Sequence, residues 1–313
     1  MRTAKPLRPS QCQSSSEIDP GIGKILGKAY SGIGIEMNDE EMVERQFKEH
    51  GFLAEDIQLG INFITSENNT WFSLLRDLNH TLQKMVVAGA EKHHGSTLDS
   101  TVLATFSGIR SLGNLQAAIL TLERGMVAEA RIMIRCLFEN AFCIAALAEN
   151  PEEFIPMLRH DNFAAKRGQA RALKDGSYSL TKDVQAAIED ISSGKKGEHL
   201  NWKKISDLSS IKSSYLFYKH LSDDSSHYSA SSLNRYLVTD RNTNTWSGYN
   251  FCPGTKEEVT LTANLCASAA LSITVGYSQV TADSTHTHEI NSLLERYSSL
   301  NNITPQNDEA PKK

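Results

Sequence analysis

The sequence predicts an all-α protein, a multi-helix bundle with flexible N-terminal and C-terminal tails. Apolar residues recur at helical spacing in most segments between residues 38 and 299, which is the main signal of amphipathic helices. No segment shows the strict apolar–polar alternation of a half-buried strand, and we find no internal repeat. Turn and cap residues separate the helical stretches, so short connections between packed helices are expected.

The composition along the chain predicts four parts. Residues 1–36 are polar and then rich in glycine, which favours a flexible tail. We expect an N-terminal helical segment over residues 37–96 and a helical-bundle core domain over residues 97–300. Residues 301–313 are polar and charged, and are expected to form a disordered tail.

Three helices are expected in the N-terminal segment. Asn38 can cap the first, because an acidic turn (residues 39–41) follows it and favours the positive end of the helix dipole. A second helix follows Gly51, and a longer one runs from Glu67 to about His93. Its apolar face is Trp71, Leu74, Leu75, Leu78, Leu82 and Met85.

The core domain opens with a pair of long helices. Thr97-Leu98-Asp99 starts a helix that runs to about Arg124. Gly125 follows, either as a break or as a point of close packing within one long helix. The central helix spans residues 126–148 and ends at Asn150-Pro151, a strong stop signal.

The remaining elements are shorter until the last long helix. A helix with Pro156 near its start is expected to run to Leu173, followed by three short ones near residues 180–192, 201–210 and 212–222. Residues 237–254 are predicted to be irregular, or a short hairpin at most. The last long helix spans residues 256–280, with Leu261, Leu265, Ala269 and Ile273 on its apolar face. A polar helix follows near residues 285–299.

The central helix carries charge where a core is expected. It is apolar on almost every side except for Arg131, Arg135 and Glu139, which lie four residues apart and so share one face. Buried arginine and glutamate are rare unless they are paired. The stripe therefore predicts a polar pocket in which arginine binds an anion and Glu139 orients a neighbour or moves a proton. The alternatives are a structural salt-bridge network and a face that meets solvent.

A second group of polar residues follows the short helix near residue 220. Tyr218 and Ser222 lie four residues apart and share a helix face. His227 stands in the serine-rich loop that follows, two residues before Ser229. A histidine in such a loop can be a general base or acid, or it can cap backbone groups.

These two groups of residues carry a family resemblance. The sequence has an R-x3-E pair after a Gly-containing helix junction, followed by the pattern Y-x3-S-x4-H-x-S. Together these patterns resemble the bacterial DUF5677 family of helical proteins over roughly residues 100–280. The matching residues are Arg135, Glu139, Tyr218, Ser222, His227 and Ser229. The resemblance implies a fold more than an activity. Some helical bundles of similar size are phage-defence or toxin proteins of the HEPN type, which cut RNA with an R-x4-6-H motif. Arg45 and His50 fit that spacing, outside the matching region.

Bulk properties narrow the class of protein. The net charge of -5 argues against a general polyanion binder, since such proteins cluster Lys and Arg. The five cysteines form no CxxC pair, which favours reduced thiols and a cytoplasmic location. The N-terminus lacks a secretory h-region, and charges interrupt the longest apolar run, so no membrane span is expected. No P-loop or convincing metal-ligand set is present, and we expect neither cofactor nor metal.

Two hypotheses about function follow. The first is a cytoplasmic module that binds a small ligand or a protein partner at a polar site inside the bundle; a homodimer would suit a long bundle. The alternative is a HEPN-like ribonuclease or nucleotide-acting enzyme of the defence kind, with RNA as a partner. In it Arg135, Glu139 and His227 would be catalytic. Arg131, Tyr218, Ser222 and Ser229 would complete the site in either case.

Overall fold

The computed structural model describes residues 49–301, except residues 56, 177, 241, 242 and 244. Two compact units divide the chain, one over residues 1–63 and one over residues 64–313. The predicted tails, the helix expected from Asn38 and the motif residue Arg45 lie wholly or almost wholly outside the described residues. In the first unit the structure describes the short helix η1 (Gly51–Leu53) and the start of α3 (Ile57–Glu67).

The second unit is a helical bundle, which confirms the all-α prediction. Its long helices are α4 (Asn69–Lys92), α5 (Ser100–Glu123), α6 (Val127–Glu149), α7 (Pro151–Asp175) and α12 (Lys256–Thr281). Its shorter helices are α8 (Lys182–Ser193), α9 (Trp202–Asp207), η2 (Lys212–Ser214), α10 (Tyr215–Leu221), η3 (Ser222–Ser226), α11 (Ala230–Asn234) and α13 (Thr287–Leu300).

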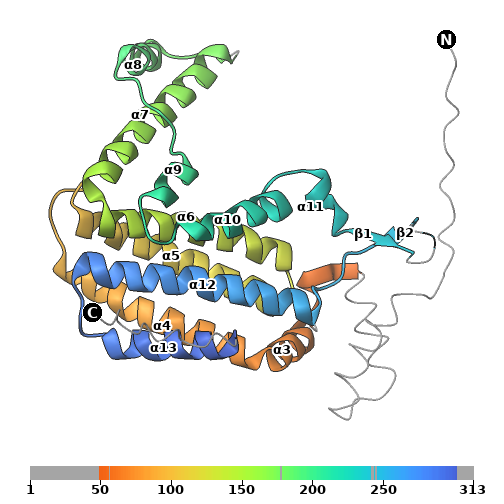
Figure 1. Ribbon diagram of the computed structural model, residues 1–313. Coiled ribbons are helices and arrows are strands. Elements are labelled where there is room, and N and C mark those ends of the chain that lie inside the picture. Colours follow the sequence, from red (N-terminus) through yellow and green to blue (C-terminus); the bar gives the residue numbers. More distant parts are fainter. Residues whose placement is uncertain (1–48, 56, 177, 241–242, 244, 302–313) are drawn as a thin grey trace, which may run out of the picture. The chain divides into compact units, whose positions relative to one another are not determined.

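Helix α12 forms the centre of this bundle. It packs against α4, α5, α6 and α13, which lie alongside it in Figure 1. By length and hydropathy α12 is the one described helix that would also suit a membrane span, but two thirds of its apolar window is buried inside the protein. Leu265, Ala269 and Ile273 are buried as expected, whereas Leu261 is 49% exposed. The predicted apolar face of α4 is buried throughout.

Glycines allow three of these helices to approach closely around one tyrosine. The Tyr277 side chain on α12 is buried and lies against Gly89 on α4 and Gly108 on α5. Its hydroxyl is 3.3 Å from the Thr105 hydroxyl, within hydrogen-bonding distance. A Cβ atom at either glycine would overlap a neighbouring side chain, so these positions require the smallest residue.

Local signals in the sequence set the helix ends. The Asp99 side chain accepts hydrogen bonds from the backbone N–H groups of Thr101 and Val102, as an N-cap should. Gly125 has a φ of +76°, which ends α5, and a Cβ atom there would lie 2.6 Å from the Pro253 side chain. Gly125 is therefore both a helix break and a point of close packing.

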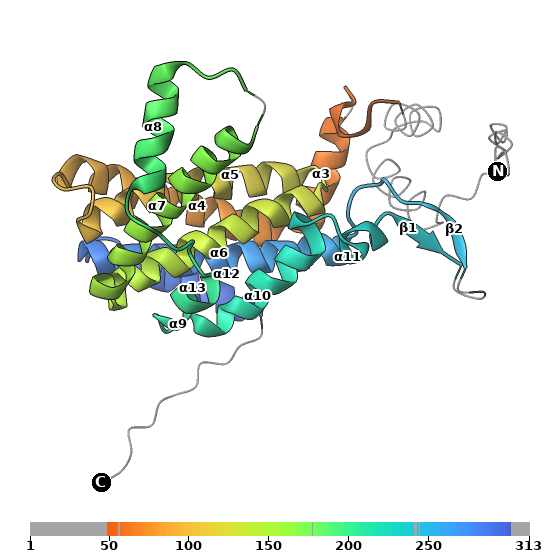
Figure 2. The same ribbon diagram turned by 90° about the horizontal axis from the view of Figure 1, so that it is seen from above.

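The chain between α6 and α12 supplies the elements that cover α6. Helices α9 and α10 and the turn η3 lie along α6, as Figure 2 shows from above. A short antiparallel hairpin follows, in which β1 (Leu237–Thr239) pairs with β2 (Trp246–Tyr249). The sequence predicted that residues 237–254 are irregular or form a short hairpin at most, and the structure has the short hairpin.

Candidate functional site

The charged face of α6 is covered by α10 and η3. The start of this covering segment is fixed to the end of α6, where the Glu149 carboxylate accepts hydrogen bonds from the backbone N–H and hydroxyl of Ser210. The side chain of Asn150 donates to the Leu208 carbonyl at 2.6 Å. These contacts lead the chain back along α6, so α10 and η3 lie over the predicted stripe.

Arg131 is buried and paired with a carboxylate. Its Nη1 lies 2.5 Å from Oδ2 of Asp224, and its Nε donates to the hydroxyl of the buried Thr262 on α12. Burial raises the pKa of Asp224, but the hydrogen bond and charge of Arg131, together with Ser225 and Arg235, outweigh it and hold the pKa below its usual value. The pair therefore stays charged and joins α6, η3 and α12.

Arg135 lies one turn further along α6 and is also held, but less completely. Its Nε donates to the Ser222 hydroxyl at 2.9 Å, and its Nη2 lies 3.0 Å from the Tyr218 hydroxyl and 3.0 Å from Glu139. Its guanidinium also lies over the Tyr218 ring. The side chain keeps 20% of its surface exposed, and Nη1 makes no hydrogen bond within the described residues.

Glu139 is a buried carboxylate whose proton is held more tightly than usual. Burial raises its pKa, and the charges of Arg135 and Arg110 and a hydrogen bond from Tyr218 only partly oppose the shift. Arg110 is an exposed residue of α5 whose positive charge also acts to lower the pKa of the Cys136 thiol, against the larger effect of burial. The carboxylate is thus subject to the charges of two guanidinium groups, the partly buried one of Arg135 and the exposed one of Arg110.

Tyr218 ties this cluster to an aromatic layer. Its ring packs edge-on against Phe142, at 6.1 Å between centroids, and lies near Trp202 and Tyr215. Burial raises the pKa of its hydroxyl, so the group stays protonated and acts as a hydrogen-bond donor at neutral pH. The ring and its neighbours fix the position of the hydroxyl against Arg135.

The turn η3 has the wide π-helical form. Such turns in helical segments often occur at functional sites, because the extra residue redirects the side chains that follow. Here Ser222 and Asp224 both reach α6, to Arg135 and Arg131 respectively. We refer to Arg131, Arg135, Glu139, Tyr218, Ser222 and Asp224 as the polar cluster.

The structure joins five of the seven predicted site residues in this cluster. The other two are His227 and Ser229. His227 is exposed and makes no hydrogen bond or ion pair within the described residues. Ser229 caps α11 by accepting a hydrogen bond from the Ser232 backbone N–H at 3.1 Å. Asp224 is an addition to the site that could have been suspected from its place two residues after Ser222.

Three further contributors come from outside α6, α10 and η3. Thr262 lies on α12, and Arg110 lies on the outer part of α5. Arg235, after α11, extends the charged network from Asp224 to Glu258. No pattern within α6 or α10 indicates these residues, because only the tertiary fold brings them near.

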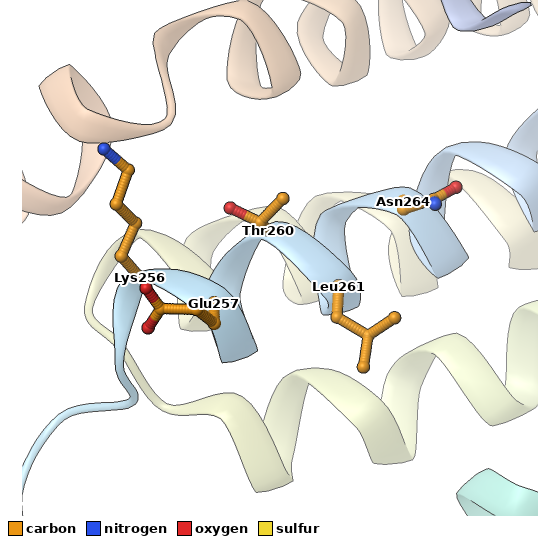
Figure 3. A pocket seen from close by; sticks show the side chains of 5 residues that line it. All are labelled: Lys256, Glu257, Thr260, Leu261 and Asn264. Atoms are coloured by element: carbon orange, nitrogen blue, oxygen red, sulfur yellow. The ribbon is translucent and has the colours of Figure 1, made fainter. Parts of the chain in front are cut away.

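A shallow hollow of about 430 Å³ lies elsewhere, along the first turns of α12. Figure 3 shows the five side chains that line it: Lys256, Glu257, Thr260, Leu261 and Asn264. Lys256 pairs with Glu67 at 2.8 Å, and the other polar contacts fasten α12 to its neighbours in the same way. Among the described residues no group of three or more His, Cys, Asp or Glu is placed to hold a metal ion.

Comparison with known proteins identifies one family. The model of DUF5677, a family of unknown function, matches residues 104–244, which include α6, α10 and η3. No curated protein and no solved structure matches the chain. The family match covers the six residues of the polar cluster and confirms the resemblance that the R-x3-E and Y-x3-S patterns indicated. The chain is thus similar to the DUF5677 family over residues 104–244.

Proposed function

We propose that this protein is a helical binding module that takes a small anionic ligand, a carboxylate or phosphate compound, at the edge of the polar cluster. One observation carries the proposal. Arg135 is fixed on three sides by Ser222, Tyr218 and Glu139, yet its Nη1 is without a partner among the described residues and its side chain is partly exposed. A guanidinium held in this way is preorganised for an anion.

The surrounding charges favour an anion. The cluster and its immediate neighbours hold four guanidinium groups (Arg110, Arg131, Arg135, Arg235) and three carboxylates (Glu139, Asp224, Glu258). Because the pKa of Glu139 is raised, its negative charge is also the most easily lost of these. Arg110, exposed beside the same carboxylate, would supply a second contact to the ligand.

The test is titration calorimetry of the full chain with inorganic phosphate, adenosine 5′-monophosphate and citrate. We expect binding that weakens with salt and falls about tenfold or more in Arg110→Gln, with an unchanged melting temperature since Arg110 is exposed. Arg171→Gln is the matched control, because Arg171 is an exposed arginine of another long helix, α7, with no hydrogen bond or ion pair among the described residues. Equal affinities of the two variants, or no binding by any probe, would refute the proposal.

The alternative function, an enzyme acting on RNA or a nucleotide, retains one supporting observation. Glu139 has a raised pKa beside Arg135, a pairing suited to proton transfer near a phosphate. The exposed position of His227 does not favour its role as the acid or base. Incubation with labelled RNA distinguishes the functions: cleavage that is lost in Arg135→Lys and in Glu139→Gln would favour the enzyme over the binding module.

A further inference from the structure

Helix α5 carries an exposed apolar stripe on its outer surface. Phe106 and Ile109 are each 52% exposed and Leu120 is 54% exposed. Gly113 lies between them, and a Cβ atom there would meet nothing within 4 Å. We call this set of four residues the α5 stripe. A surface helix normally presents charged residues to water, so an exposed stripe of this kind indicates a binding face.

Charge is nearly absent from this helix. The only charged residues within α5 are Arg110 and Glu123, and Glu123 is buried against Arg76 at 2.5 Å. Arg110 lies on the flank that faces α6, since its charge acts on Glu139. The centre of the stripe therefore contains no charge that an apolar partner would have to desolvate.

The order of residues along the stripe makes it complementary to itself. Phe106 and Leu120 lie seven residues before and after Gly113, and Ile109 and Ala117 lie four residues before and after it. If two copies of α5 cross antiparallel on a twofold axis at Gly113, Phe106 faces the partner's Leu120 and Ile109 faces the partner's Ala117. The missing side chain of Gly113 lets the two helices approach closely at the axis.

The charges at the ends of α5 match in the same arrangement. Arg124 lies eleven residues after Gly113 and Asp99 lies fourteen residues before it, so the two are separated by about 4.5 Å along the paired helices at 1.5 Å per residue. When the two helices run nearly antiparallel, Arg124 at the C-terminal end would thus lie beside the partner's Asp99 at the N-terminal end. The two helix dipoles are also opposed, which is the favourable direction. In the same arrangement Arg110 faces the partner's Gln116, which carries no charge.

We propose that a second copy of this chain packs on the α5 stripe, forming a twofold dimer with Gly113 on its axis. The inference goes beyond the proposed ligand site and stands on different residues. A twofold interface repeats each contact twice, so each apolar residue of the stripe contributes at two places. A substitution of one such residue is present in both copies, so it changes the free energy of dimerisation by twice the amount of a single contact.

Sedimentation of the full chain over a range of concentrations is the first test. We expect a monomer–dimer equilibrium, with a dissociation constant raised about a hundredfold or more in Leu120→Glu. Leu294→Glu is the matched control, because Leu294 is an exposed leucine of α13 outside the stripe, 37% exposed. A monomer at every concentration, or a dimer that both variants leave equally intact, would overturn the proposal.

Cross-linking tests the position of the axis. A cysteine on a twofold axis lies next to its own copy, so Gly113→Cys is expected to give a covalent dimer when diamide is added as the oxidant. Gly168→Cys is the control, since Gly168 is an exposed helical glycine of α7 with open space around it. Equal yields of covalent dimer from the two variants, after subtraction of the band given by the natural cysteines, would rule out the axis at Gly113.

Discussion

Two arginines one turn apart on α6 have different surroundings and hence different roles. Arg131 is 6% exposed and meets Asp224 and Thr262, so its positive charge is compensated inside the bundle. Removing one partner of such a buried pair costs on the order of 3–5 kcal/mol, because the other charge is left uncompensated. Arg135 keeps an accessible amino group, which is why we assign it to binding and Arg131 to architecture.

Glu139 leads to a prediction about pH. Burial raises its pKa in the folded chain above the usual value of 4.5, to which it returns on unfolding. The folded chain therefore binds this proton more tightly, and the stability that results is fully present below about pH 4.5 and is lost as the pH rises through the folded pKa. Glu139→Gln cannot lose a proton and keeps an oxygen that can accept from Arg135.

We expect the melting temperature of Glu139→Gln to increase relative to that of the unmodified protein as the pH rises from about 4.5 to the folded pKa of Glu139. Above that pKa the difference between the two melting temperatures is expected to stay constant. The measurement is thermal unfolding followed by circular dichroism at several pH values. Glu295→Gln, at an exposed position of α13, serves as the control. If the melting temperatures of Glu139→Gln and of the unmodified protein differ by the same amount at every pH, burial does not raise the pKa of Glu139.

At the residue scale the sequence predicts which side chains share a helix face, because that follows from their spacing. The spacing of Arg131, Arg135 and Glu139 predicts their common face, and the spacing of Tyr218 and Ser222 predicts theirs. The partner of Arg131 does not follow from any period, because Asp224 reaches it through the π-helical form of η3. A local pattern also does not determine that the following loop leaves His227 exposed.

At the element scale, helix ends are predicted better than helix neighbours. Asp99 and the Asn150-Pro151 pair mark the ends of α5 and α6 because cap and proline effects are local. Leu261 was expected on the apolar face of α12 but is half-exposed. It lies in the first turns of the helix, where it lines the shallow surface hollow.

The glycines of α4 and α5 give opposite predictions for the same substitution. A methyl group added at Gly89 would overlap the hydroxyl of Tyr277 and disturb its contact with Thr105. Overpacking of this kind costs about 1–3 kcal/mol, more than the roughly 1 kcal/mol that alanine gains over glycine in a helix. Gly113 has open space around it in the single chain, so only the gain applies in the monomer.

Gly89→Ala is therefore expected to lower the free energy of unfolding and Gly113→Ala to raise it, by up to about 1 kcal/mol. Urea denaturation of the two variants, at one protein concentration low enough for the chain to be a monomer, measures both effects. Each variant is the other's control, since both add one methyl group to a long helix. Two changes of the same sign would show that Tyr277 adapts to the methyl group without loss.

At the scale of the whole molecule, the family region and the folding unit have different limits. The DUF5677 match covers residues 104–244, whereas the compact unit covers residues 64–313. The difference matters because α4 and α12 lie outside the match. Helix α12 packs on both α5 and α6, and α4 packs on α5, so the matched segment alone would expose the faces that these helices cover.

We therefore predict that a fragment of residues 64–301 folds and that a fragment of residues 104–244 does not. The longer fragment retains α4, α5, α6 and α13, which pack on α12. The shorter one loses Thr262, the α12 partner of Arg131, and leaves α6 without the buried face of its main neighbour. Circular dichroism with a thermal scan distinguishes the two, since a cooperative transition requires a common core. A cooperative transition in the shorter fragment would mean that the cluster of α6, α10 and η3 is stable without α12, and that the family region is a domain by itself.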